Sequence, residues 1–166
     1  MSRVQKIIHQ LALKPHPEGG WYREIYRSAE SVPPAGLPPR FGGARAFATS
    51  IYFLLEGSDF SAFHRIRQDE LWHFYDGDGL TIHVIDKSGG YSRKKLGRNP
   101  DQGEAFHHVV AAGDWFGATV SSGGFALVGC TVVPGFDFDD FEMAERHTLL
   151  QLYPQHRDII ARLTRS

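Results

Sequence analysis

Short apolar runs separated by glycine- and aspartate-rich turns fill the middle of this sequence, from residue 46 to residue 136. Runs of this length, bounded by turn residues, are typical of β-strands. Many short strands at regular spacing indicate a sandwich or barrel rather than a parallel α/β sheet. The sequence therefore predicts an all-β barrel. Its strand-like runs are 46–55, 61–66, 70–75, 80–86, 106–111, 115–120 and 125–133.

The residues before the barrel predict a short helix and an extended arm. Ser2 and Gln5 form a capping-box pattern, and the apolar residues that follow recur at helical spacing, which predicts a helix over 3–12. Pro15 and Pro17 end it. Residues 15–27 are expected to form an arm that ends in a strand, with Tyr22, Glu24 and Tyr26 on one face.

Two further segments complete a single domain over residues 1–166. Residues 28–45 hold four prolines and three glycines, so we expect a loop without regular structure. After Pro134 the pattern becomes helical: Asp139 and Glu142 resemble a capping box, and Pro154 opens a final helix, so 139–163 is expected to hold helices.

The charge balance excludes several classes of partner. The chain has 18 basic and 19 acidic side chains, whereas a general nucleic-acid binder has a strong basic excess. Its one basic cluster, Arg93–Lys95, is interpreted as a solvated turn. No apolar run reaches the roughly 18–20 residues of a membrane span, and no secretory signal is visible. With Cys130 as the only cysteine, expected to be a buried inert thiol, the chain is expected to be cytoplasmic.

The stretch from Gly57 to Gly77 carries the clearest chemical pattern. It resembles the first motif of the cupin superfamily, G-x5-H-x-H-x3,4-E-x6-G, with His64 and Glu70 in place but Ile66 at the second histidine position. The best match to the second cupin motif puts Phe116 where the third histidine belongs.

These replacements weaken the case for a metal. A catalytic transition metal usually needs about three protein ligands, and His64 with Glu70 supplies two. His73 is the remaining candidate, but an offset of three residues from Glu70 places it on the opposite face of a regular strand. We therefore expect no cofactor. The alternative is a divalent transition metal held by His64 and Glu70, with His73 as a third ligand.

A wider set of motifs resembles one small, largely uncharacterised cupin-like family, which is related in fold to RmlC, the dTDP-sugar epimerase, and to seed storage proteins. The motifs run in order from residue 11 to about 152 and include P-H-P-E-G-G-W-Y-R-E from Pro15, and G-C-T-V-V-P-G-F from Gly129. The resemblance implies a double-stranded β-helix (jelly roll), usually a homodimer, and no agreed activity.

Three functions follow from these residues. The leading one is a metal-independent small-molecule site in the barrel mouth, with isomerase- or epimerase-like chemistry, because RmlC-type epimerases use a histidine base oriented by a carboxylate and a tyrosine acid. The alternatives are the metal-dependent cupin enzyme and a non-catalytic binding or storage-like protein. The predicted catalytic residues are His64, Glu70, and Tyr52 or Tyr75. The predicted ligand-binding residues are Arg23, Glu24, Arg65, Trp72, His73, Trp115 and Phe116.

Overall fold

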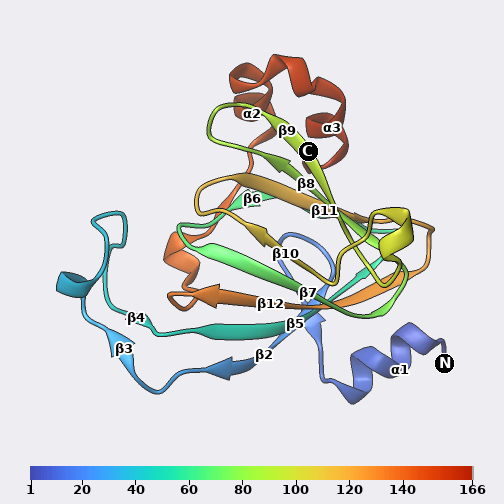
Figure 1. Cartoon of the computed structure of the whole chain (residues 1–166), viewed down its shortest axis with the longest axis horizontal. Helices are drawn as coiled ribbons and strands as arrows, with labels where there is room; N and C mark the ends of the chain where they lie inside the picture. Colours follow the sequence, from blue (N-terminus) through green and yellow to red (C-terminus); the bar gives the residue numbers. More distant parts are fainter. Residues whose placement is uncertain (166) are drawn as a thin grey trace.

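Two antiparallel sheets face each other across a common interior in the computed structural model, which describes residues 1–165 (Figure 1). The first sheet has six strands in the order β1 (Lys14–Pro15), β2 (Trp21–Arg27), β5 (Thr49–Glu56), β12 (Phe125–Val133), β7 (Asp69–Gly77) and β10 (His107–Val110). The second has five, in the order β13 (Glu142–Met143), β6 (Ser61–Arg65), β11 (Trp115–Val120), β8 (Leu80–Ile85) and β9 (Tyr91–Leu96). This is the predicted jelly roll.

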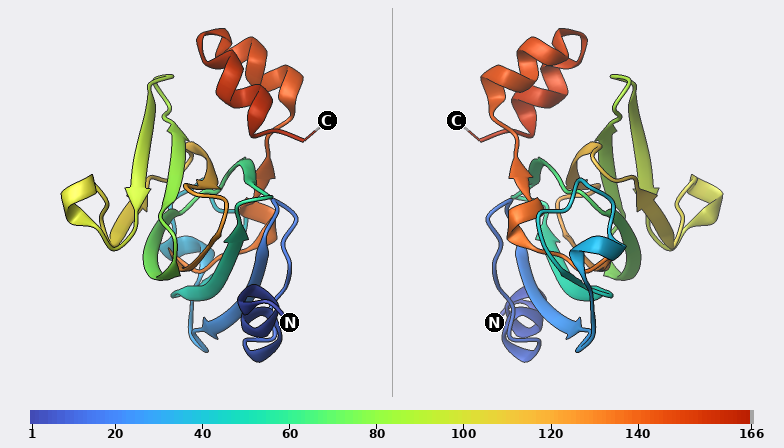
Figure 2. Two further views of the ribbon diagram at one scale, coloured as in Figure 1. Left: turned by 90° about the vertical axis from the view of Figure 1, so that its right-hand side faces the viewer. Right: turned by 90° about the vertical axis from the view of Figure 1, so that its left-hand side faces the viewer.

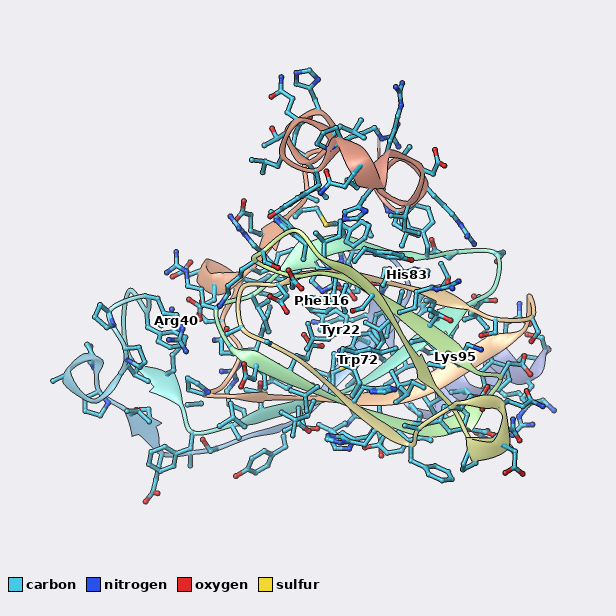
Figure 3. All side chains as sticks on the ribbon, turned by 45° about the horizontal axis from the view of Figure 1, so that its top comes forward. Tyr22, Arg40, Trp72, His83, Lys95 and Phe116 are labelled. Carbon is cyan, nitrogen blue, oxygen red and sulfur yellow. The ribbon has the colours of Figure 1, made fainter. Side chains whose placement is uncertain are left out.

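Apolar side chains that alternate along these strands fill the space between the sheets. Trp72 and Phe116 are fully buried there, and Tyr22 packs against them from β2 (Figure 3). Alternation sends the neighbouring residues outward, as sheets with one buried face require. The outer face of the second sheet packs a second apolar cluster, which includes Ile85 and Trp115, against the C-terminal helices.

The terminal helices are short and lie on opposite sides of the barrel (Figure 2). α1 (Arg3–Gln10) begins at the predicted capping box, in which the Ser2 side chain accepts from the Gln5 backbone and the Gln5 side chain accepts in return. α2 (Arg146–Leu152) is capped by Glu145, and a 3-10 turn, η4 (Pro154–His156), leads into α3 (Arg157–Arg162). None of the helices within residues 1–165 has the length and apolar character to cross a bilayer.

Three local predictions were wrong. Residues 28–45 are not without regular structure: β3 (Ser31–Val32) pairs with β4 (Arg45–Ala46) around the turn η1 (Pro34–Gly36). Arg93–Lys95 lies within β9 rather than in a turn, because an edge strand with one solvated face accepts charged side chains. Asp139 and Glu142 form no capping box. Asp137 caps the turn η3 (Phe138–Asp140), and Glu142 joins β13. A remaining turn, η2 (Pro100–Gln102), precedes β10.

Large apolar side chains are exposed on the strands of the first sheet, where no helix covers them. They are Ile25, Tyr26, Tyr75, Val109 and Val133. Large apolar side chains exposed on one sheet are typical of an interaction site when they lie together. The homodimer implied by the family resemblance stays a prediction.

Candidate functional site

A cavity of about 470 Å³ opens between the two sheets at one end of the barrel. Its floor carries four ionisable side chains and one thiol: His16, Glu18, His64, Glu70 and Cys130. Aromatic rings from β2, β5 and the segment after β12 form its walls: Tyr22, Phe53, Phe136, Phe138 and Phe141. An apolar cavity with a few convergent polar groups is the usual form of a small-molecule site. We call it the barrel cavity.

A tight turn between β1 and β2 places Glu18 in this cavity. Gly19 and Gly20 both have positive φ, at 112° and 72°, a conformation that residues with a side chain rarely adopt. The turn is closed by a bond from the Gly19 N–H to the His16 carbonyl and anchored to β6, whose Ala62 N–H donates to the Glu18 carbonyl at 2.8 Å. The two glycines therefore let the chain reverse while the Glu18 side chain points inward.

His64, on β6, is held between two partners. Its Nδ1 lies 2.7 Å from the Ala62 carbonyl oxygen, which only accepts, so Nδ1 carries a proton. Its Nε2 then faces Oε2 of Glu18 at 3.0 Å, and the Ser61 hydroxyl donates to the other carboxyl oxygen, Oε1, at 2.9 Å. One proton must lie between Nε2 of His64 and Oε2 of Glu18. These two residues are called the Glu18–His64 couple below.

Burial determines which partner holds that proton at rest. It lowers the pKa of His64 to about 4, although the bond to the Ala62 carbonyl opposes this. Burial, together with the nearby charge of Glu70, raises the pKa of Glu18 well above its usual range, against the bond from Ser61. Both effects favour neutral groups in a low-dielectric site. The resting couple is a carboxylic acid that donates to a neutral imidazole.

His16 lies beside the couple. Its Nδ1 accepts the Glu18 backbone N–H at 3.2 Å and lies 3.5 Å from Oε2 of Glu18. Burial and the charge of His64 lower the pKa of His16 to about 3, so it is neutral near pH 7 and carries its proton on Nε2. Its ring meets Tyr22 edge-on at 4.5 Å. His16 is thus a second neutral imidazole in contact with the same carboxyl group.

Glu70 brings a second carboxyl group into the barrel cavity from β7. Burial raises its pKa to about 7, and a hydrogen bond with the Cys130 thiol opposes the rise. Burial and the charges of Glu70 and Glu18 raise the pKa of Cys130 well above its usual range. The thiol is therefore buried and protonated, as the sequence predicted. Glu70 is close to half-ionised near neutral pH.

The charged side chains at the mouth come from the arm and β2. Glu24 and Arg27 form a bidentate pair with distances of 2.9 Å and 2.8 Å, and the Lys14 ammonium lies 5.2 Å from the centre of the Tyr22 ring. The prediction that Tyr26 shares a face with Glu24 was wrong. A shift in register between Glu24 and Tyr26 turns Arg27 toward the cavity instead, because a bulge resets the alternation.

The sequence-predicted residues divide between the cavity and other places. His64, Glu70 and Glu24 line the cavity, but the carboxyl group that hydrogen-bonds His64 is Glu18 and not Glu70. Tyr52 and Tyr75 contact each other on the outside of the first sheet, at a ring distance of 6.0 Å. His73 also faces outward, with its ring 4.9 Å from that of His107. The nearest register shift in β7 comes after His73, so regular alternation still places it on the face opposite Glu70.

The other predicted ligand-binding residues also lie outside the cavity lining. Trp72 and Phe116 belong to the core, although the Phe116 ring supports His64 at 4.1 Å. Trp115 packs under the C-terminal helices, with the Arg65 guanidinium over its ring, and Arg65 pairs with Glu142 at 2.7 Å. Arg23 donates to the Leu11 carbonyl. No arginine pairs with Glu70 among the described residues.

The donor set does not fit the metal site of a typical cupin. Ile66 and Phe116 occupy two ligand positions and have no donor atom. Of the remaining two, His64 uses both ring nitrogens within the protein, and Glu70 bonds Cys130. Within residues 1–165 no three His, Cys, Asp or Glu side chains have the geometry to hold a metal ion.

His16 and Glu18 are the functional candidates that sequence reasoning missed. Both lie in the P-H-P-E-G-G motif that carries the family resemblance, yet neither falls on a cupin ligand position. Glu18 and His64 are 46 residues apart in the sequence, so no local periodicity predicts their contact. The sequence does hold one signal for Glu18: two glycines follow it directly, and such a pair indicates a tight turn that can direct the carboxylate inward.

Comparison with known proteins places this chain in a family. A family described as "Cupin superfamily (DUF985)" matches residues 5–144. The chain belongs to this family. Protein SO0799 from Shewanella oneidensis has a similar crystal structure, with a TM-score of 0.90 and 40% identity over 99% of both chains. A hypothetical protein from Leishmania major has a TM-score of 0.89 and 35% identity over 99% of this chain and 100% of its own.

Two more distant likenesses are a sequence relative and a solved structure, and the second supports the fold alone. An uncharacterised protein of Saccharomyces cerevisiae, YML079W, is 29% identical over 163 residues, which span 90% of this chain and 76% of the yeast protein. Oxalate decarboxylase from Bacillus subtilis has a TM-score of 0.56 at 14% identity, over 90% of this chain and 36% of its own. The family and its nearer relatives are described without an activity, so a function has to be argued from the site.

Proposed function

We propose that this cupin binds a small carbonyl compound in the barrel cavity and moves a proton to or from it without a metal. The observation that carries this proposal is the 3.0 Å contact between Nε2 of His64 and Oε2 of Glu18, buried at the floor of that cavity. A positioned acid–base pair at the floor of a ligand-sized cavity is the arrangement that proton-transfer enzymes use.

The couple works in both directions. With the shared proton on Glu18, the carboxyl group is an acid that can protonate a bound carbanion. When that proton passes to Nε2 of His64, Glu18 becomes a carboxylate that can remove a proton from a carbon next to a carbonyl group. After Glu18 has taken a proton from the ligand, the couple holds one extra proton. Its positive charge offsets the negative charge that remains on the ligand. Ser61 keeps the carboxyl group in place throughout.

The rest of the cavity suits a molecule of sugar size. Its volume of about 470 Å³ lies within the range of small-ligand sites, and its aromatic walls can pack against a ring. Glu70, with a pKa of about 7, offers a second group that can exchange a proton from another direction. Isomerisation or epimerisation next to a carbonyl group needs a proton removed and returned, which two such groups provide.

Exchange of solvent deuterium tests the proposal directly. The protein, purified with chelator, is incubated in D₂O with a panel of aldoses, ketoses and nucleotide sugars, and deuterium at carbon is followed by NMR. We expect exchange with at least one compound, and a loss of at least about 100-fold in Glu18→Gln. Glu30→Gln, which alters an exposed carboxylate away from the cavity, should match the wild type. Absence of exchange across the panel, or equal rates in Glu18→Gln, contradicts the proposal.

A further inference from the structure

A second hollow lies directly behind one wall of the barrel cavity, and its lining holds four cationic side chains and three carboxylates. It has a volume of about 690 Å³ and shares only Ile66 and Phe141 with the barrel cavity, so the two lie back to back across these side chains. Four cationic side chains from three separate segments face it: Arg40, Arg65, Arg67 and Lys87. We call it the basic hollow.

Two of the three carboxylates of the basic hollow, Asp140 and Glu142, are already hydrogen-bonded to neighbouring side chains. Asp140 accepts two bonds of 2.7 Å from Arg45, which lies outside the hollow, and a third from Gln68. Glu142 pairs with Arg65 at 2.7 Å. Of the three carboxylates, Asp139 alone forms no ion pair within residues 1–165.

Of the three cations other than Arg65, two form no ion pair within residues 1–165, and the third forms a long one. Arg40 and Lys87 have no carboxylate within 4.0 Å, and Arg67 reaches Asp140 only at 3.7 Å. Lys87 also lies near enough to Asp114 to favour its ionised form, without forming an ion pair. Cationic side chains that converge on one hollow raise the local concentration of anions, so this group favours an anionic ligand.

Two of the guanidinium groups are fixed in position. Nε of Arg40 donates to the Arg67 carbonyl, and Nη1 of Arg67 donates to the Arg40 carbonyl, each at 2.8 Å. The Arg40 guanidinium also stacks over the Phe41 ring at 4.8 Å. This reciprocal brace ties the β3–β4 loop to the turn after β6, and Figure 3 shows Arg40 at that end of the barrel. Both groups keep further N–H donors free.

We propose that the basic hollow is a phosphate-binding site. Paired guanidinium groups match the oxygens of a phosphate, and a neighbouring ammonium adds charge without fixed geometry. The phosphate has two sources: the free ion, or the phosphate group of a ligand whose body enters the barrel cavity past Ile66 and Phe141. The inference does not depend on the proton-transfer chemistry proposed above.

Titration with inorganic phosphate, followed by calorimetry and by NMR of the arginine Nε–H signals, tests the site. Chloride at the same ionic strength is the reference. We expect phosphate to bind with the Arg40 and Arg67 signals shifting, and its affinity to fall at least tenfold in Arg67→Gln. Lys87→Gln, an exposed change that leaves the brace intact, should weaken binding several-fold. Arg157→Gln, an exposed arginine on α3, should change it less than twofold.

A second titration with propyl phosphate distinguishes the two sources. If only the arginine signals shift, the site takes the free ion. If the ring signals of His16 and His64 shift as well, the ester reaches the barrel cavity and the phosphate belongs to a cavity ligand. Phosphate that binds no better than chloride overturns the proposal, as does an equal loss of affinity in Arg157→Gln.

Discussion

Two buried histidines in this barrel have similar electrostatics and very different surroundings. Burial lowers the pKa of both His64 and His83 to about 4, and for His83 the charges of Arg162 and Arg93 add to the effect. His64 faces the barrel cavity and a carboxylic acid. His83 lies on the other side of the second sheet, where its ring nitrogens meet the hydroxyl groups of Tyr91 at 2.7 Å and Thr119 at 2.9 Å.

The difference teaches that a shifted pKa alone does not identify a reactive group. His83 is a satisfied structural histidine, because its partners are hydroxyl groups that donate or accept as needed and no described cavity reaches it. His64 shares a single proton with an acid that lines a cavity. His64 and His83 are therefore a matched pair of buried histidines, one reactive and one structural.

The largest expected difference is in proton transfer. His64→Gln should lower the rate of deuterium exchange by about 100- to 10,000-fold, because Glu18 loses the partner that accepts its proton. His83→Gln should leave the rate within twofold of wild type. Rates are measured by NMR on a compound that the wild type exchanges, with circular dichroism to confirm folding. Equal losses in both variants would mean that the Glu18–His64 couple has no special role.

The second difference is in how stability depends on pH. The pKa of Glu70, about 7 in the folded protein and 4.5 ordinarily, means that the folded state binds the extra proton between these values. Its contribution of about 3 kcal/mol is therefore present below the unfolded pKa of 4.5 and is lost as pH rises from there through about 7. For His83 the unfolded chain binds the extra proton between pH 4 and 6.5, so stability is lost as pH falls through that window.

Urea unfolding at several pH values separates these two effects. Glu70→Gln should reduce the loss of stability between pH 5 and 8.5. His83→Gln should reduce the loss between pH 6.5 and 4, by about 2 kcal/mol after allowance for solvent screening. A Glu70→Gln curve parallel to that of the wild type above pH 5 would show that Glu70 is already ionised there.

Replacing each histidine with alanine should lower stability more at His83 than at His64, which is the reverse of the order expected for activity. His83→Ala removes a ring from between the sheet and the C-terminal helices and leaves two hydroxyl groups without their partner, at a cost of about 2 kcal/mol. His64→Ala enlarges a cavity that already opens to solvent, so water replaces the lost contacts and the cost should be about 1 kcal/mol. Urea midpoints at pH 7 measure both. A larger loss in His64→Ala would show that the couple stabilises the fold.

The sequence was enough to predict the barrel and His64, but not Glu18, and the reasons are physical. Strand alternation and turn residues are local signals, so the core strands were predicted to within a few residues. His64 and Glu70 were found because they lie on one strand-turn-strand unit with a recognisable spacing. Glu18 was not, because a turn with two positive-φ glycines and a pairing across 46 residues brings it to His64. Register shifts, such as the bulge after Glu24, also leave no periodic trace.

The smallest expected effects come from removing one hydroxyl group at each site. Ser61→Ala deletes the bond to Oε1 of Glu18, and Tyr91→Phe deletes the bond to Nδ1 of His83; each should cost about 1 kcal/mol of stability. The Ser61 bond also favours the ionised form of Glu18, so its loss raises that pKa further and should move the pH–rate profile of exchange to higher pH. Tyr91→Phe should leave the profile in place, because His83 contacts nothing in the barrel cavity. Identical profiles in both variants would show that Glu18 does not set the pH dependence.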